Sequence, residues 1–346
     1  MSTVERVTAS DLPGKAIPYH LEVGRGRAFL LQGMVNRFLA SGAETNETMA
    51  VTDVVGPAGR PIPWHYHDDR WGQHDLFYCV RGRVKVWADH ECRILNPGDL
   101  ASVPPGTAHS LQLLEHYTEM LGPVVPWQWI RFSEMAAPDY PRPAYPAVDD
   151  SPPPSREHLE RAIAEGLLTP TPDHPVAEPR FDAPDDALPD ATVPYFLRAG
   201  EGPRHTLFGQ VCFQLLTGVQ SNGRIALTVT EGPAGPALPA HVHEQTYKGI
   251  FCLDGRMRVT TNGEVHELIR GDFVNIPMGT EHTYGLEAGF NRFITMSSPA
   301  GIERFFELAG EPYEHRIFPS SAEAPDPGKL AALSDVIDIK FTGGTK

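Results

Sequence analysis

Short runs of β-branched and aromatic residues alternate with turn residues along most of the chain. Runs such as FYCV, VCFQ and IFCL are bounded by glycine, proline and charged residues, and the chain holds 34 Pro and 32 Gly. Runs this short, with turn residues between them, are typical of strands rather than of helices. The pattern predicts an all-β protein built as a sandwich or a barrel.

Two stretches depart from this pattern. SREHLERAIAEGLL places Leu159, Ile163 and Leu167 on one helical face, and Ser155 stands where an N-cap is expected. The surrounding residues are rich in proline and acid, so we expect a linker with one short helix that packs on a barrel and has no chemical role. A second helix is expected at residues 328–337, followed by a strand at residues 338–342.

The chain is a duplication. PYHLEVGRG begins at Pro18 and PYFLRAGEG at Pro194, and the offset between these two openings also carries His65 onto His241. After the histidines the offset is shorter by three, and it then carries Gly82 onto Gly255, so the first copy has three extra residues in this segment. We therefore predict an N-terminal tail (1–13), an N-terminal domain (14–135), a linker (136–190), a C-terminal domain (191–316) and a terminal helix and strand (317–346).

The charge and the distribution of apolar residues argue against several classes of function. The 346 residues carry a formal net charge of −15, which would repel nucleic acid and anionic membranes alike. No stretch approaches the roughly 20 apolar residues of a membrane-spanning helix, and the N-terminus lacks the apolar run of a signal peptide. We expect a soluble, cytoplasmic protein without nucleic-acid or membrane partners that binds a small molecule; a homodimer is compatible with the sequence. The four cysteines form no CxxC pair and are expected to be buried thiols.

Three histidines recur in each copy. Each copy has an H-x-H pair, PWHYH and PAHVH, and a third histidine that ends PPGTAH or PMGTEH. Alternate residues of a strand share a face, so both histidines of a pair project to one side. Recurrence of the trio predicts metal sites, with the ligands His65, His67 and His109 in the first copy and His241, His243 and His282 in the second.

The H-x-H and PxGxxH motifs resemble those of cupins, and the double arrangement with the PY-L openings resembles bicupin quercetin 2,3-dioxygenases. The resemblance covers nearly the whole chain, including HEQTYKGIFCLDG and GDFVNIPMGTEHTY. It implies two jelly-roll barrels in tandem with metal ligands pointing into each barrel. It also implies a divalent transition metal, Fe, Mn, Co, Ni or Cu, and dioxygen as co-substrate.

The family has a glutamate ligand seven residues before the motif glycine, and this chain departs from it in both copies. Counting back from Gly82 gives Asp75, which we expect to be the fourth ligand and the general base; the extra residues leave His74 as an alternative ligand. Counting back from Gly255 gives Lys248, and a protonated amine offers no lone pair to a metal. The second trio could therefore hold metal weakly, hold it through three histidines, or hold none, with Lys248 paired to Glu244 or Glu281.

The resemblance implies oxygen-dependent cleavage of a flavonol-like or related enolisable aromatic substrate. Two other classes stay open, a metal-dependent cupin isomerase, epimerase or hydrolase and a non-catalytic ligand-binding bicupin. Several aromatic residues surround the first trio, and strand alternation directs Phe77 toward the metal and Trp64 and Tyr66 away from it. We expect most of the aromatics around this trio to pack in the core or between the domains: Trp64, Tyr66, Phe77, Tyr78 and Trp87.

Overall fold

The computed structural model describes residues 12–68, 70–142, 144–146, 153–182, 187–235, 238–319 and 327–342. The chain divides into two compact units, which we call the N-terminal and the C-terminal unit. Of these described residues, those within 12–14, 24–43 and 47–199 form the N-terminal unit, and those within 15–23, 44–46 and 200–342 form the C-terminal unit.

In each unit two antiparallel sheets enclose the core. Among the described residues, the N-terminal unit has a seven-stranded sheet, β13-β9-β6-β11-β4-β3-β2, and a five-stranded sheet, β12-β5-β10-β7-β8. The elements are β2 (Arg27–Leu31), β3 (Met34–Ala40), β4 (Ala50–Gly56), β5 (His65–Tyr66), β6 (His74–Arg81), β7 (Val84–Ala88), β8 (Glu91–Leu95), β9 (Leu100–Val103), β10 (His109–Leu113), β11 (Thr118–Val125), α1 (Trp129–Ala136), α2 (Arg156–Ala164), β12 (Thr169–Pro170) and β13 (Tyr195–Leu197).

The C-terminal unit repeats this architecture. Over the residues described, its sheets run β1-β21-β18-β23-β16-β15-β14-β24 and β20-β19-β22-β17-β25. The elements are β1 (Tyr19–Leu21), β14 (Arg204–Leu207), β15 (Gln210–Leu216), β16 (Ala226–Gly232), β17 (His241–Val242), β18 (Tyr247–Asp254), β19 (Arg256–Thr261), β20 (Glu264–Ile269), β21 (Phe273–Ile276), β22 (His282–Leu286), β23 (Asn291–Ser298), η1 (Ile302–Arg304), α3 (Phe305–Ala309), β24 (Glu311–Pro312), α4 (Pro327–Leu333) and β25 (Lys340–Phe341).

Strand alternation builds both cores. In the N-terminal unit Phe77 and Cys79 of β6 pack against Val84 and Val86 of β7, on the facing sheet. In the C-terminal unit Ile250 and Cys252 of β18 pack in the same way against strands of the facing sheet. The predicted all-β fold of two tandem barrels is confirmed. The four cysteines are buried and free, as expected.

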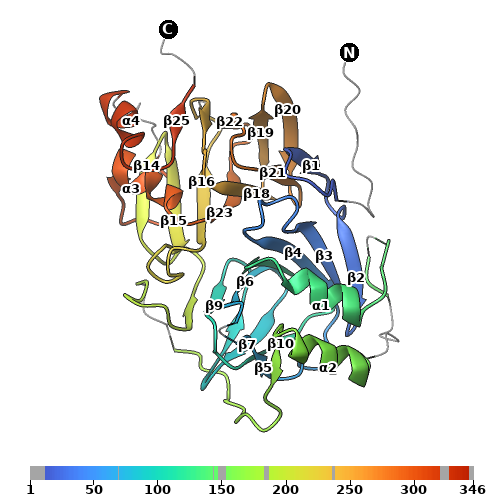
Figure 1. Cartoon of the computed structure of the whole chain (residues 1–346). Coiled ribbons are helices and arrows are strands. Elements are labelled where there is room, and N and C mark those ends of the chain that lie inside the picture. The colour runs from blue at the N-terminus through green and yellow to red at the C-terminus, as the bar shows by residue number, and fades with distance from the viewer. Residues whose placement is uncertain are drawn as a thin grey trace. The chain divides into compact units, whose positions relative to one another are not determined.

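Each unit receives its edge strand from the opening segment of the other sequence copy. Strand β1, from the first copy, pairs with β21 of the C-terminal unit, and β13, from the second copy, pairs with β9 of the N-terminal unit. Figure 1 shows the blue strand β1 next to β21. The predicted domain boundaries placed residues 15–23 in the N-terminal domain and residues 191–199 in the C-terminal domain, and the structure assigns each to the other unit.

Short helices cover part of each barrel. Helices α1 and α2, green in Figure 1, share an apolar cluster that includes Phe132 and Ala162, and the Ser155 hydroxyl accepts the backbone N–H of His158 as the N-cap. Ile163, predicted to be on the packed face, is 39% exposed because the helix turns Ala162 inward instead. None of the described helices is long and apolar enough to cross a membrane.

Candidate metal centres

The three histidines of the first trio, His65, His67 and His109, meet within the N-terminal unit. His65 lies on β5 and pairs directly with His109, the first residue of β10, and His67 follows one residue beyond β5. The ring centroids lie 4.4 to 5.2 Å apart, and one nitrogen from each ring falls within 4.8 Å of the others. All three side chains are buried. The predicted convergence of this trio is present in the structure.

Backbone carbonyls fix the orientation of all three rings. Each Nδ1 lies at hydrogen-bond distance from a carbonyl oxygen, which can only accept, so Nδ1 carries the proton and the lone pair of Nε2 points inward. Burial lowers the pKa of His65 well below its usual range and that of His109 to about 4, so both rings are neutral, as metal ligands must be. The distances are 2.8 Å for His65 to Pro63, 2.6 Å for His67 to Leu167 and 2.9 Å for His109 to Thr107.

Asp75 completes the cluster. Its Oδ2 lies 3.1 Å from His67 Nε2 and 3.7 Å from His109 Nε2. The alternative ligand, His74, points away, since its Nε2 lies 2.8 Å from Ser102 Oγ. Burial alone would raise the pKa of Asp75, but His67, together with the amide N–H of Gln73, brings it well below its ordinary value. The geometry therefore favours Asp75 over His74, and its roles as ligand and base stay predictions.

Gln73 is a member of the site that was not predicted from the sequence. Its Nε2 donates to Asp75 Oδ1 at 2.9 Å and lies 3.0 Å from His67 Nε2. The side chain is buried. Two residues before Asp75, it reaches the same side of the chain, and it falls in the segment that holds the three extra residues of the first copy. That insertion was the signal that could have identified it.

The side chains of this cluster suit a divalent metal as ligands. Asp75 Oδ2 has no hydrogen-bond donor among the described residues, and it faces the inward lone pair of His67 Nε2. Two acceptors that face each other in a buried site require a cation or a proton between them. Three neutral imidazoles and one carboxylate are a common ligand set for divalent transition metals.

An apolar cavity of about 270 Å³ opens from this cluster. Trp129 of α1 lies nearly parallel to the His65 ring, 6.3 Å away, and Phe132 stacks on Trp129 at 4.7 Å. Phe77 lines the cavity as predicted. Trp64, expected to face away from the metal, also lines the cavity, although its ring stacks on His174 at 4.4 Å.

The predicted linker contributes to the site through residues that follow its helix and through one residue of the helix that lines the cavity. Strand β12 pairs with β5, and the Leu167 carbonyl just before it accepts the Nδ1 proton of His67. Leu159 and Leu168 line the cavity. The linker therefore holds one ligand and forms part of the wall.

The second trio has the same scaffold. His241 on β17 pairs with His282 on β22, and the ring centroids of the three histidines lie 4.2 to 5.2 Å apart. One nitrogen from each ring again lies within 4.8 Å of the others. Every Nδ1 is at hydrogen-bond distance from a backbone carbonyl: 2.8 Å for His241 to Pro239, 2.5 Å for His243 to Asp338 and 3.0 Å for His282 to Thr280.

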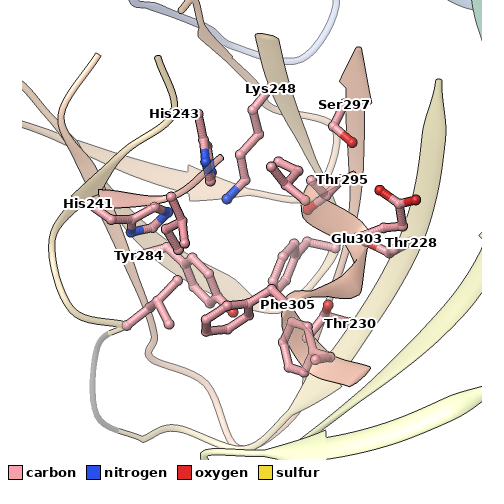
Figure 2. Close-up of a pocket in the computed structure, with 15 residues that line it drawn as sticks. Thr228, Thr230, His241, His243, Lys248, Tyr284, Thr295, Ser297, Glu303 and Phe305 are labelled. Carbon is pink, nitrogen blue, oxygen red and sulfur yellow. The ribbon is translucent and has the colours of Figure 1, made fainter. Parts of the chain in front are cut away.

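Lys248 takes the place of the acidic residue in this second cluster. Figure 2 shows its amine reaching down toward the histidines, and its Nζ lies 3.3 Å from His282 Nε2. Burial lowers the pKa of Lys248 to about 8. Burial and the nearby amine lower the pKa of His243 to about 3. The predicted alternative of an ion pair between Lys248 and Glu244 is not seen, because Glu244 pairs with Lys340 at 2.7 Å.

Two jelly-roll units, each with an inward histidine trio, define the chain as a bicupin. The cupin domain family matches residues 52–115 and 227–289. Solved structures agree in fold: protein Ylba from E. coli has a TM-score of 0.55 at 10% identity and covers 86% of this chain and 94% of its own. An oxalate decarboxylase variant from Bacillus subtilis has a TM-score of 0.53 at 17% identity, over 81% of this chain and 77% of its own.

In sequence, the chain is similar to two proteins named quercetin 2,3-dioxygenase. It is 27% identical over 330 residues to the quercetin 2,3-dioxygenase of Bacillus subtilis, which covers 95% of this chain and 97% of that protein. It is 24% identical over 349 residues to the quercetin 2,3-dioxygenase of Aspergillus japonicus, over 90% of this chain and 97% of the relative.

Proposed function

We propose that the protein is a metal-dependent dioxygenase that cleaves a flat, enolisable aromatic substrate of the flavonol type with dioxygen. The observation that carries the proposal is the apolar cavity that ends at His65, His67, His109 and Asp75. Its size lies near the lower end of the range for pockets that enclose a drug-sized ligand. Similarity to two proteins named quercetin 2,3-dioxygenase, over nearly the whole chain, supports the same chemistry.

His65, His67 and His109 with Asp75 would hold the metal, which would act as a Lewis acid on the oxygen of the substrate hydroxyl. Asp75 lines the cavity as a carboxylate whose Oδ2 lacks a donor among the described residues, so this oxygen can accept the proton that the hydroxyl loses. Gln73 donates to the other oxygen, Oδ1, and so keeps Oδ2 turned toward His67 and His109.

The cavity walls suit an aromatic substrate. Trp129, Phe132 and Phe77 offer ring faces and edges, and the remaining lining is mainly aliphatic. Such walls exclude water from a reactive anion. Among the described residues that line the cavity there is no lysine or arginine, which disfavours a small dianion such as the substrate named for the oxalate decarboxylase neighbours.

The test is an oxygen-electrode screen of metal-replete protein with quercetin and other phenolic enols, combined with detection of carbon monoxide. We expect one equivalent of dioxygen per substrate consumed, release of carbon monoxide, and loss of both on Asp75→Ala. Substrate conversion without oxygen uptake would place the protein with the cupin isomerases, epimerases or hydrolases. Tight binding of a phenolic enol without turnover would favour a non-catalytic, ligand-binding bicupin.

A further inference from the structure

Strand register makes Lys248 the structural counterpart of Asp75. Asp75 pairs with Val103 on β9 and Val124 on β11. Lys248 pairs with Ile276 on β21 and Ser297 on β23, which occupy the same positions in the second sequence copy. The equivalence extends to the preceding residues, because the contact of His74 with Ser102 corresponds to that of Tyr247 with Asn275.

The exchange of carboxylate for amine replaces a hydrogen-bond acceptor beside the histidines with a hydrogen-bond donor. In the N-terminal unit the inward lone pairs meet Asp75, another acceptor, and the cluster needs a cation. In the C-terminal unit the residue at this position is a protonated amine, which has three N–H donors and no lone pair. His282 Nε2 lies 3.3 Å from Lys248 Nζ, so this lone pair already has a donor without any added ion.

From this geometry we propose that Lys248 is the built-in cation of the C-terminal trio. It excludes a divalent metal there, and the chain consequently binds one metal ion, in the N-terminal unit. The inference concerns metal binding alone and does not depend on the reaction proposed above.

Space and charge both support exclusion. A metal bonded to an imidazole lies about 2.0–2.1 Å from the nitrogen. That is well within the 3.3 Å between His282 Nε2 and Lys248 Nζ, so ion and amine compete for the same volume. A divalent ion beside the ammonium would also place two like charges together in a buried site, where the penalty is large.

The rest of the C-terminal cavity does not supply compensating charge. The cavity measures about 50 Å³, enough for a few water molecules. Figure 2 shows the hydroxyls of Thr295 and Ser297 on the side away from His241 and His243. Glu303 also lines it, but its carboxylate accepts the backbone N–H groups of Gly218, at 3.1 Å, and Gly301. No carboxylate lies within 4 Å of Lys248 Nζ among the described residues.

Metal stoichiometry tests the proposal. Metal-free protein is dialysed against excess Co²⁺, and bound cobalt is counted by elemental analysis and followed by its visible absorption. We expect one tightly bound ion per chain in the wild type, loss of this tight binding in His109→Ala, and its retention in the matched variant His282→Ala. Two ions in the wild type, or loss of the single ion in His282→Ala, would overturn the proposal.

The substitution Lys248→Glu restores a carboxylate opposite the trio and should raise the content from one ion to two. Adding His282→Ala to that variant should return it to one. Lys248→Met serves as the second variant: it removes the amine without adding a ligand, and the three histidines should then bind a second, weaker ion. Circular dichroism confirms that each variant is folded. If folded Lys248→Glu and Lys248→Met both still bind one ion, Lys248 is not what excludes the metal.

Discussion

The buried amine of Lys248 should give metal-free protein a specific dependence of stability on pH. In the folded protein the pKa of Lys248 is lowered from 10.5 to about 8 by burial. Between these two values the unfolded chain holds the proton and the folded chain does not, so the free energy of unfolding must rise with pH. A gap of about 2.5 units corresponds to about 3 kcal/mol in total, of which about 2 kcal/mol should be visible by pH 9.5.

Lys248→Met removes this contribution, so the quantity to measure is the difference in unfolding free energy between wild type and variant. Urea unfolding followed by circular dichroism from pH 7 to 9.5 reports both units. Tryptophan fluorescence reports the N-terminal unit, because all five Trp lie at positions 64 to 129. Cysteine and tyrosine ionisation is common to both proteins and cancels in the difference.

Lys340→Met is the matched control, since Lys340 lies on β25 of the same unit with its side chain 60% exposed. It should leave the pH profile unchanged. A wild-type minus Lys248→Met difference that stays flat from pH 7 to 9.5, or that falls, would show that the amine does not lie in a dry site and would refute the reasoning.

Three further predictions concern the N-terminal site, with whichever substrate the oxygen screen identifies. His109→Ala should abolish turnover with the far-UV spectrum unchanged, because the imidazole is a ligand and not a core side chain; loss of fold would contradict this. Asp75→Asn should lower kcat by roughly 10²–10⁴-fold, the usual contribution of a general base, and a rate within twofold of wild type would exclude that role. Phe132→Ala should cost about 3 kcal/mol in urea unfolding and raise KM, because the ring is buried and also lines the cavity, whereas an unchanged KM would place it outside the substrate site.

The fold and both histidine trios could be predicted because the information is local. A strand displays every second residue on one face, so H-x-H fixes the direction of two ligands without knowledge of the rest of the chain. The recurrence of the trio at matching positions of the second copy distinguishes it from a chance cluster. The same alternation placed Phe77 in the cavity and directed Asp75, rather than His74, toward the histidines.

The exchange of edge strands could not be predicted, because the two opening segments are near copies. PYHLEVGRG and PYFLRAGEG offer the same hydrophobic pattern, and either could pair with β9 or with β21. Only the tertiary structure decides which strand joins which sheet. Trp129, Leu159 and Leu168 were missed for a related reason: they reach the cavity from segments that lie far from the histidines in sequence.

The linker and the C-terminal tail play the same structural role, each in its own unit. In the N-terminal unit α2 is followed by β12, which pairs with β5, and Leu167 accepts from His67 Nδ1. In the C-terminal unit α4 is followed by β25, which pairs with β17, and Asp338 accepts from His243 Nδ1. Neither segment has a motif of its own, so the sequence gives no sign that either one holds a ligand.

Because both units have this supporting helix and strand, the backbone scaffold alone cannot account for different chemistry in the two barrels. Both trios are buried, and in both the backbone carbonyls turn the Nε2 lone pairs inward. What differs is the side chain at one register position, Asp75 or Lys248, and the space beside it, about 270 Å³ against about 50 Å³. A carboxylate beside a large apolar cavity suits a metal and a substrate, whereas an amine beside a small one supplies a donor to His282 Nε2 and a positive charge beside the trio. The duplicated fold thus keeps the same histidine trio in both units, and on our proposal the charge of the residue at this register position decides which trio binds an ion.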